Sequence, residues 1–95
     1  MYIYFTKDGE FSANELPEDV ELHRDSGPAL IRTVNDKVVS EKWYKNNVLH
    51  RADGPAVSFF NHQCITRRAY FFNGKHYLDI KKWEAEVLRQ TFELI

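Results

Sequence analysis

Histidine and arginine stand side by side twice in the sequence, as His23–Arg24 and as His50–Arg51. Imidazole acts as a base near neutral pH, and guanidinium binds phosphate or carboxylate. Both pairs belong to a longer match, because Leu-His-Arg-Asp-Ser-Gly-Pro-Ala at 22–29 recurs 27 residues later as Leu-His-Arg-Ala-Asp-Gly-Pro-Ala at 49–56. Because the His-Arg pair recurs once in each repeat unit, a structural role is favoured over a catalytic one. We therefore expect each imidazole to hydrogen-bond a neighbouring turn and each guanidinium to pair with Asp25 or Asp53.

Three other residues, His62, Cys64 and His76, have side chains that could bind a metal or act as a nucleophile. A metal site needs three or four converging ligands, and no acidic partner stands at a recognisable spacing from these residues. The sequence also has no glycine-rich phosphate loop and no nucleophile elbow. We predict no catalytic, metal-binding or cofactor-binding residue, no enzymatic activity, and a buried hydrophobic role for Cys64.

The densest acidic stretch runs from Glu15 to Glu21 and contains no basic residue. Its four carboxylates could mimic the phosphates of a nucleic acid or contact a basic surface of a partner protein. A solvated loop beside Pro17 is the simpler explanation of the same residues. The candidate partner-binding residues of this acidic lead-in are Glu15, Glu18, Asp19 and Glu21.

Residues 26–78 have the opposite charge, with eight Lys or Arg residues against three acids. Basic side chains interleaved with aromatic ones are typical of proteins that follow a nucleic-acid backbone and stack unpaired bases. The alternative function is therefore single-stranded nucleic-acid binding, although the aromatic residues are also needed for a core. The residues that would carry this alternative are Arg32, Lys42, Arg67 and Lys75.

The repeat predicts short strands separated by turns, because Gly-Pro interrupts any hydrogen-bonded ladder. We expect strands at 29–34 and 56–60, with return strands at 38–45 and 64–72, from their β-branched and aromatic residues. Residues 4–9 resemble the half of a repeat unit that contains the aromatic residues and the turn. The turns are predicted at residue pairs that tolerate positive φ, namely Asp8–Gly9, Asn35–Asp36, Asn46–Asn47 and Asn73–Gly74.

A helix is predicted over 80–93, after Asp79 as its N-cap. One apolar stripe at helical spacing should pack on the sheet and cover its second face. The residues of this stripe are Ile80, Trp83, Val87, Leu88, Thr91 and Phe92.

The chain of 95 residues, with 43% hydrophobic and 28% charged residues, is the size of one domain. We predict an α+β fold that is mainly β: an antiparallel meander of about six short strands with one C-terminal helix on the sheet. Its parts are an N-terminal hairpin and acidic lead-in (1–21), two repeats (22–78) and the helical segment (79–95). The single cysteine indicates a cytoplasmic protein, and the lack of an apolar stretch of about 20 residues indicates that the chain does not enter a membrane. We expect a monomer or a homodimer.

The repeat resembles the MORN-like repeats of phage, giant-virus and bacterial proteins, in which His-Arg-x-Asp-Gly-Pro-Ala is followed by Trp-Tyr-x-Asn-Gly. The resemblance covers residues 22–75, with Ser26 and Asn47 as departures from the motif. It implies stacked β-hairpins that serve as scaffolds and recognition surfaces. By analogy, the chain is expected to be a phage accessory protein that binds and inhibits a bacterial defence complex, with an anti-CRISPR-like role.

Overall fold

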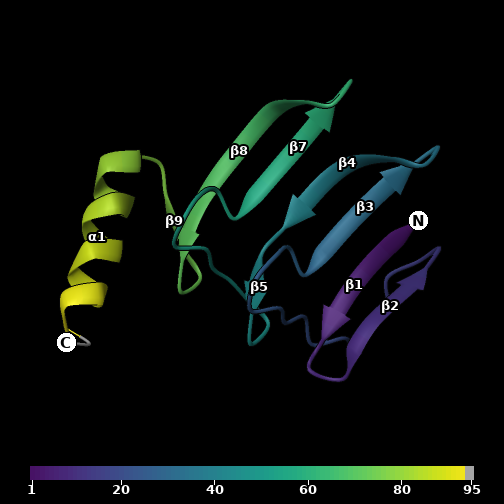
Figure 1. Ribbon diagram of the computed structural model, residues 1–95, viewed down its shortest axis with the longest axis horizontal. Coiled ribbons are helices and arrows are strands. Elements are labelled where there is room, and N and C mark those ends of the chain that lie inside the picture. The colour runs from purple at the N-terminus through teal and green to yellow at the C-terminus, as the bar shows by residue number, and fades with distance from the viewer. Residues whose placement is uncertain (94–95) are drawn as a thin grey trace.

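The computed structural model describes residues 1–93, which form nine strands and one helix (Figure 1). Seven strands make one antiparallel sheet in the order β2-β1-β3-β4-β7-β8-β9, and β5 and β6 form a separate hairpin. The bounds are β1 Tyr2–Thr6, β2 Gly9–Ala13, β3 Leu30–Val34, β4 Lys37–Lys42, β5 Tyr44–Lys45, β6 Val48–Leu49, β7 Val57–Asn61, β8 Cys64–Phe72, β9 Lys75–Tyr77 and α1 Ile80–Glu93.

The predicted fold class is confirmed: the described chain is mainly antiparallel strands with one C-terminal helix. More strands form than the six expected, because each return strand ends in a small hairpin of its own. Trp43 interrupts the expected strand at 38–45, so β4 ends at Lys42 and β5 begins at Tyr44. The helix has the predicted bounds, and the Asp79 carboxylate accepts a hydrogen bond of 2.9 Å from the Lys81 N–H, as an N-cap does.

Four tight turns have two consecutive residues with positive φ, which matches the twist of the flanking strands. Three of them were predicted, at Asn35–Asp36, Asn46–Asn47 and Asn73–Gly74. The fourth, His62–Gln63, lacks the usual turn residues. At Asp8–Gly9 the positive φ of 130° belongs to Gly9.

The strand register divides the side chains of the large sheet between two faces, because paired residues of neighbouring strands point to the same side. One row across β1, β3, β4, β7 and β8 is Tyr2, Arg32, Ser40, Phe59 and Arg67. The row beside it, which points to the opposite face, is Ile3, Ile31, Glu41, Ser58 and Arg68.

The acidic lead-in crosses the face that carries Tyr4 and Leu30, which we call the lead-in face. Leu16 and Val20 pack there against the buried cluster of Leu22, Ala29 and Leu30. The opposite side, with Ile31 and Glu41, is called the open face. The molecule measures 41 × 31 × 19 Å, so it is thin across the sheet.

The helix packs on the sheet, as predicted, but it covers only one end of the open face, where the indole of Trp83 lies 4.8 Å from the Tyr70 ring. It packs against β8 and β9 at one end of the sheet (Figure 1). Trp83 is buried, whereas Ile80, Leu88 and Phe92 of the predicted stripe are exposed, Phe92 to 70%. A helix at the end of the sheet presents one narrow line of residues to β8 and β9, so only part of its apolar stripe finds a partner.

Candidate protein-binding groove

Both motif histidines hold the turn of the next hairpin. His23 Nδ1 accepts a hydrogen bond of 2.9 Å from the Asn46 N–H, and His50 Nδ1 accepts one of 2.9 Å from the Asn73 N–H. The predicted structural role of the imidazoles is therefore confirmed. Nδ1 must be unprotonated to accept, which fixes both rings in the tautomer with hydrogen on Nε2.

Both motif arginines lie between an aromatic ring and a glycine. The guanidinium carbon of Arg24 is 4.0 Å from the centre of the Phe5 ring, and that of Arg51 is 3.9 Å from the ring centre of Trp43. Each Nη1 also donates to a proline carbonyl, at 3.2 Å for Pro28 and 3.0 Å for Pro55. The arginines thus act inside the fold, which leaves them unsuited to bind a ligand.

The acidic residues of the two motifs behave differently. Asp53 pairs with Arg51 at 2.8 Å, as predicted. Asp25 lies instead against His23 Nε2 at 3.1 Å, so its predicted pairing with Arg24 is wrong. The motif has its acid one position earlier in the first unit, where Ser26 replaces the aspartate, and that shift brings the carboxylate to the histidine.

Asn47 occupies a turn position at which the motif usually has glycine. Its backbone N–H donates to the Leu22 carbonyl at 2.7 Å, and its side-chain oxygen accepts from the Leu22 N–H at 3.1 Å. In the second unit Gly74 makes the corresponding backbone bond to Leu49, at 2.8 Å. The asparagine therefore adds a side-chain hydrogen bond that ties the start of the first unit to its turn.

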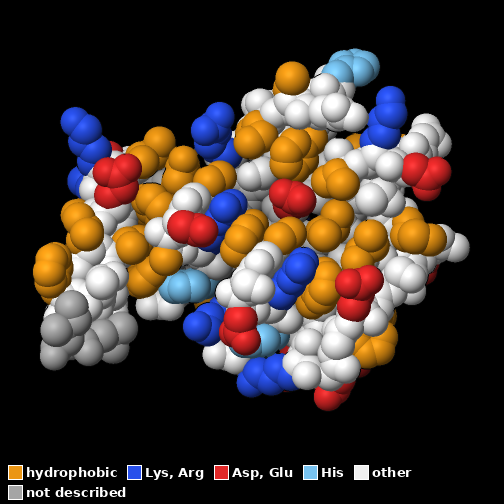
Figure 2. All heavy atoms as spheres, in the orientation of Figure 1, with side chains coloured by type: hydrophobic (Ala, Val, Ile, Leu, Met, Phe, Trp, Pro, Cys, Tyr) orange, Lys and Arg blue, Asp and Glu red, His pale blue; other side chains and the backbone are white. Residues whose placement is uncertain are grey.

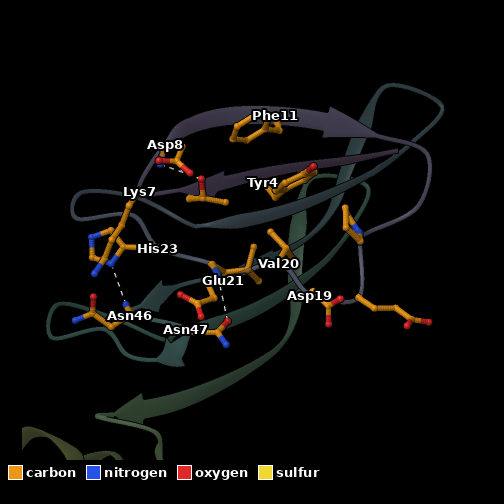
Figure 3. A pocket seen from close by; sticks show the side chains of 14 residues that line it. Tyr4, Lys7, Asp8, Phe11, Asp19, Val20, Glu21, His23, Asn46 and Asn47 are labelled. Atoms are coloured by element: carbon orange, nitrogen blue, oxygen red, sulfur yellow. Dashed lines mark hydrogen bonds between the residues drawn. The ribbon is translucent and has the colours of Figure 1, made fainter.

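A groove of about 860 Å³ lies between the β1–β2 hairpin and the acidic lead-in (Figure 3). Tyr4 from β1 and Phe11 from β2 form one wall, with their rings stacked 5.5 Å apart. Val20 and Glu21 of the lead-in lie opposite, and the turn at Asn46–Asn47 closes the lower end (Figure 3). Phe11 is 42% exposed although it is a large apolar residue, so the groove has an accessible aromatic wall.

The charged residues around the groove are mostly acidic. Glu18, Asp19 and Glu21 line it, as the sequence suggested, together with Asp8 and Lys7 from the β1–β2 turn. Glu15, the fourth predicted residue, is exposed but does not line the groove. The lining contribution of Asp8, Tyr4 and Phe11 was missed, because only the fold brings the first hairpin over the lead-in.

Three of the four residues predicted to bind nucleic acid share the lead-in face. Arg32 and Arg67 belong to one row, on either side of Phe59, and Lys42 lies in the next row beside Val57. Lys75 pairs with Phe72 and so points to the opposite side of the sheet. The structure therefore separates Lys75 from the other three.

Cys64 is exposed at the start of β8, so its predicted burial is wrong. The turn His62–Gln63 places it at the tip of a hairpin, beyond the buried part of the sheet. Among residues 1–93 no three His, Cys, Asp or Glu side chains cluster as metal ligands do. In the same part of the chain, no helix is long and apolar enough to span a membrane.

Shifted pKa values occur at His50, Tyr44 and Glu86. Burial lowers the pKa of His50 below its ordinary 6.5, and the charge of Lys45 lowers it further. Burial raises the pKa of Tyr44. On the helix, hydrogen bonds from Arg89 and then Gln90 lower the pKa of Glu86 to about 2.

The fold is therefore α+β and mainly β, with a repeated β-hairpin unit and a groove at one side of the sheet. Comparisons with protein-family models, with curated proteins and with solved structures found no match to the chain.

Proposed function

We propose that this chain is a small protein-binding module that inhibits its partner by occluding a basic surface. In the most specific form of the proposal, it is a phage-encoded, anti-CRISPR-like inhibitor that acts on a bacterial defence complex in the host cytoplasm. The observation that supports binding is the groove, in which four carboxylates surround an accessible aromatic wall. Resemblance to MORN-like repeats supports the recognition role.

The mechanism follows from the chemistry of such a surface. A protein surface that receives nucleic acid is rich in Lys and Arg, and the carboxylates of the groove offer it a substitute for phosphates. Long basic side chains also pack well on aromatic faces, such as that of Phe11. Acidic residues would speed the encounter and set its orientation, while aromatic burial would supply most of the affinity.

The first test is a pull-down of the tagged chain from a bacterial lysate, with and without nuclease, read by mass spectrometry. A stoichiometric protein partner that survives nuclease is the expected result. Binding of that partner should fall about 10- to 100-fold in the variant Glu18→Gln/Asp19→Asn/Glu21→Gln, because three charge contacts contribute roughly 0.5–1 kcal/mol each.

The matched control is Glu10→Gln/Asp36→Asn/Glu84→Gln, which makes the same change in net charge at exposed sites outside the groove. It should bind the partner as the unmodified chain does. Equal affinity of the groove variant and the control would refute the role of the groove.

The row of Arg32, Phe59 and Arg67 favours a second function, the binding of single-stranded nucleic acid. All three side chains are exposed, and Phe59, which is 40% exposed, can stack an unpaired base between two phosphate contacts. Arg32 and Arg67 are three strands apart, or about 14 Å.

Fluorescence anisotropy with a labelled oligonucleotide separates this function from the first. If it holds, Arg67→Gln should weaken binding and reduce the slope of log K against log salt by about one, because one phosphate contact is lost. Lys75→Gln removes the same charge from the other side of the sheet and should leave the slope unchanged. Identical effects of the two variants would argue for unspecific attraction.

A further inference from the structure

The open face of the sheet is apolar at several points, and among residues 1–93 α1 covers only its β8 end, where Trp83 packs on Tyr70. Ile3, Ile31, Phe60 and Ile65 lie on it by strand register, and Ile65 is 44% exposed. The acidic lead-in crosses the other face, and α1 packs at the end of the sheet. In the space-filling view of one face, hydrophobic side chains spread over the strands with single charged groups among them (Figure 2). A sheet with such a face is normally covered by a second layer.

Two charged residues of the open face, Glu41 and Arg68, lie symmetrically about β7. Glu41 on β4 and Arg68 on β8 are the two neighbours of Ser58 on β7, one strand to each side, or about 5 Å away. Ser58, which lies between the two, is small and only 5% exposed. Arg68 is exposed, and Glu41 is half-buried.

This arrangement is complementary to itself. When a second copy is laid face to face about a two-fold axis that runs along the strands over Ser58, position Glu41 comes opposite Arg68, and Arg68 opposite Glu41. Phe60 lies two residues further along the same strand, and therefore close to the same axis, so the two Phe60 rings meet. The strands of the two sheets are then aligned, as in β-sandwiches.

We propose that the open face binds a second copy of this chain, in a symmetric dimer that carries two equivalent Glu41–Arg68 pairs. The two longer extents of the molecule are 41 and 31 Å, and a face within them has room for the roughly 800 Å² per partner of a standard interface. The dimer goes beyond the proposed function, because the groove and the Arg32–Arg67 row lie on the other face and remain accessible.

Light scattering coupled to size-exclusion chromatography tests the proposal with reversed charges. The unmodified chain should have twice the mass of the 11.3 kDa protomer. Glu41→Arg and Arg68→Glu should each weaken dimerisation at least tenfold, because like charges then meet across the axis. Glu41→Arg/Arg68→Glu together should restore the dimer, since the pairs form again with their signs exchanged.

Substitutions at two exposed apolar positions provide a second test, which does not depend on the charges of Glu41 and Arg68. Ile65→Lys on the open face should give a monomer, whereas Phe59→Lys, on the other face of the same hairpin, should stay dimeric. Circular dichroism identifies variants that fail to fold. A monomeric unmodified chain at high concentration, or a folded double variant that stays monomeric, would overturn the proposal. Dimers that persist in all charge variants would also overturn it, because pairing through the edges of β2 or β9 would be indifferent to Glu41 and Arg68.

Discussion

At the scale of single residues, the most informative feature is the space that the motif glycines leave. A Cβ atom added to Gly54 would lie 2.9 Å from the guanidinium carbon of Arg51, and one added to Gly27 would lie 2.7 Å from that of Arg24. These glycines are therefore explained by close packing, with the arginine held between the glycine and an aromatic ring. The Arg-x-x-Gly part of the motif therefore encodes this contact, and it occurs twice in the chain.

Gly54→Ala should destabilise the chain by about 1–3 kcal/mol, because the guanidinium must leave its place on the Trp43 ring. Urea unfolding followed by circular dichroism measures the change. In the background Arg51→Ala the same substitution should cost much less, since the added methyl group then meets no guanidinium. Additive effects of the two substitutions would show that Gly54 is needed for another reason.

At the scale of elements, each unit is fastened to the next by its histidine. His50 follows β6, yet it holds the turn between β8 and β9 through the Asn73 N–H, and its ring is 4.5 Å from that of Phe72. The hydrogen bond needs a neutral imidazole. Folding should therefore depend on the protonation of this residue.

Stability should fall as the pH decreases from neutral through 6.5, the ordinary pKa of histidine. The pKa of His50 is lowered in the folded chain, so below 6.5 the unfolded chain binds a proton that the folded chain does not. Thermal unfolding across this range measures the loss. His50→Gln should flatten the dependence, whereas His62→Asn in an exposed turn should leave it intact. An unchanged pH profile in His50→Gln would exclude His50 as its source.

The helix supplies the last of three side chains that each lie against an aromatic ring of the sheet or its hairpins. Arg24 lies on Phe5 and Arg51 on Trp43, and at the third place the indole of Trp83 lies 4.8 Å from the Tyr70 ring. Its Nε1–H donates to the Arg51 carbonyl at 3.2 Å, which joins the helix to the second unit. Trp83 thus takes the place that a third motif arginine would occupy.

At the scale of the whole molecule, the two faces of one thin sheet carry different kinds of surface. The lead-in face carries the acidic groove at one side and the Arg32–Arg67 row at its middle, while the open face carries the apolar patch with Glu41 and Arg68. Among the described residues no large side chain is less than 2% exposed. A sheet with so little enclosed core gains stability from whatever covers its faces.

The sequence alone determined the local structure. Gly-Pro, the asparagine-rich turns and the helical stripe after Asp79 act over a few residues, so β8 and α1 have the bounds that were predicted, and both histidines hold turns. The contacts between distant segments were decided only by tertiary structure. The register sets Arg67 and Lys75 on opposite sides, the hairpin tip exposes Cys64, and the path of the lead-in brings Asp8 and Phe11 beside Glu18. Such contacts depend on how the strands pair across the whole sheet. Residue types that are close in the sequence do not determine which distant strand becomes the partner, or in which register.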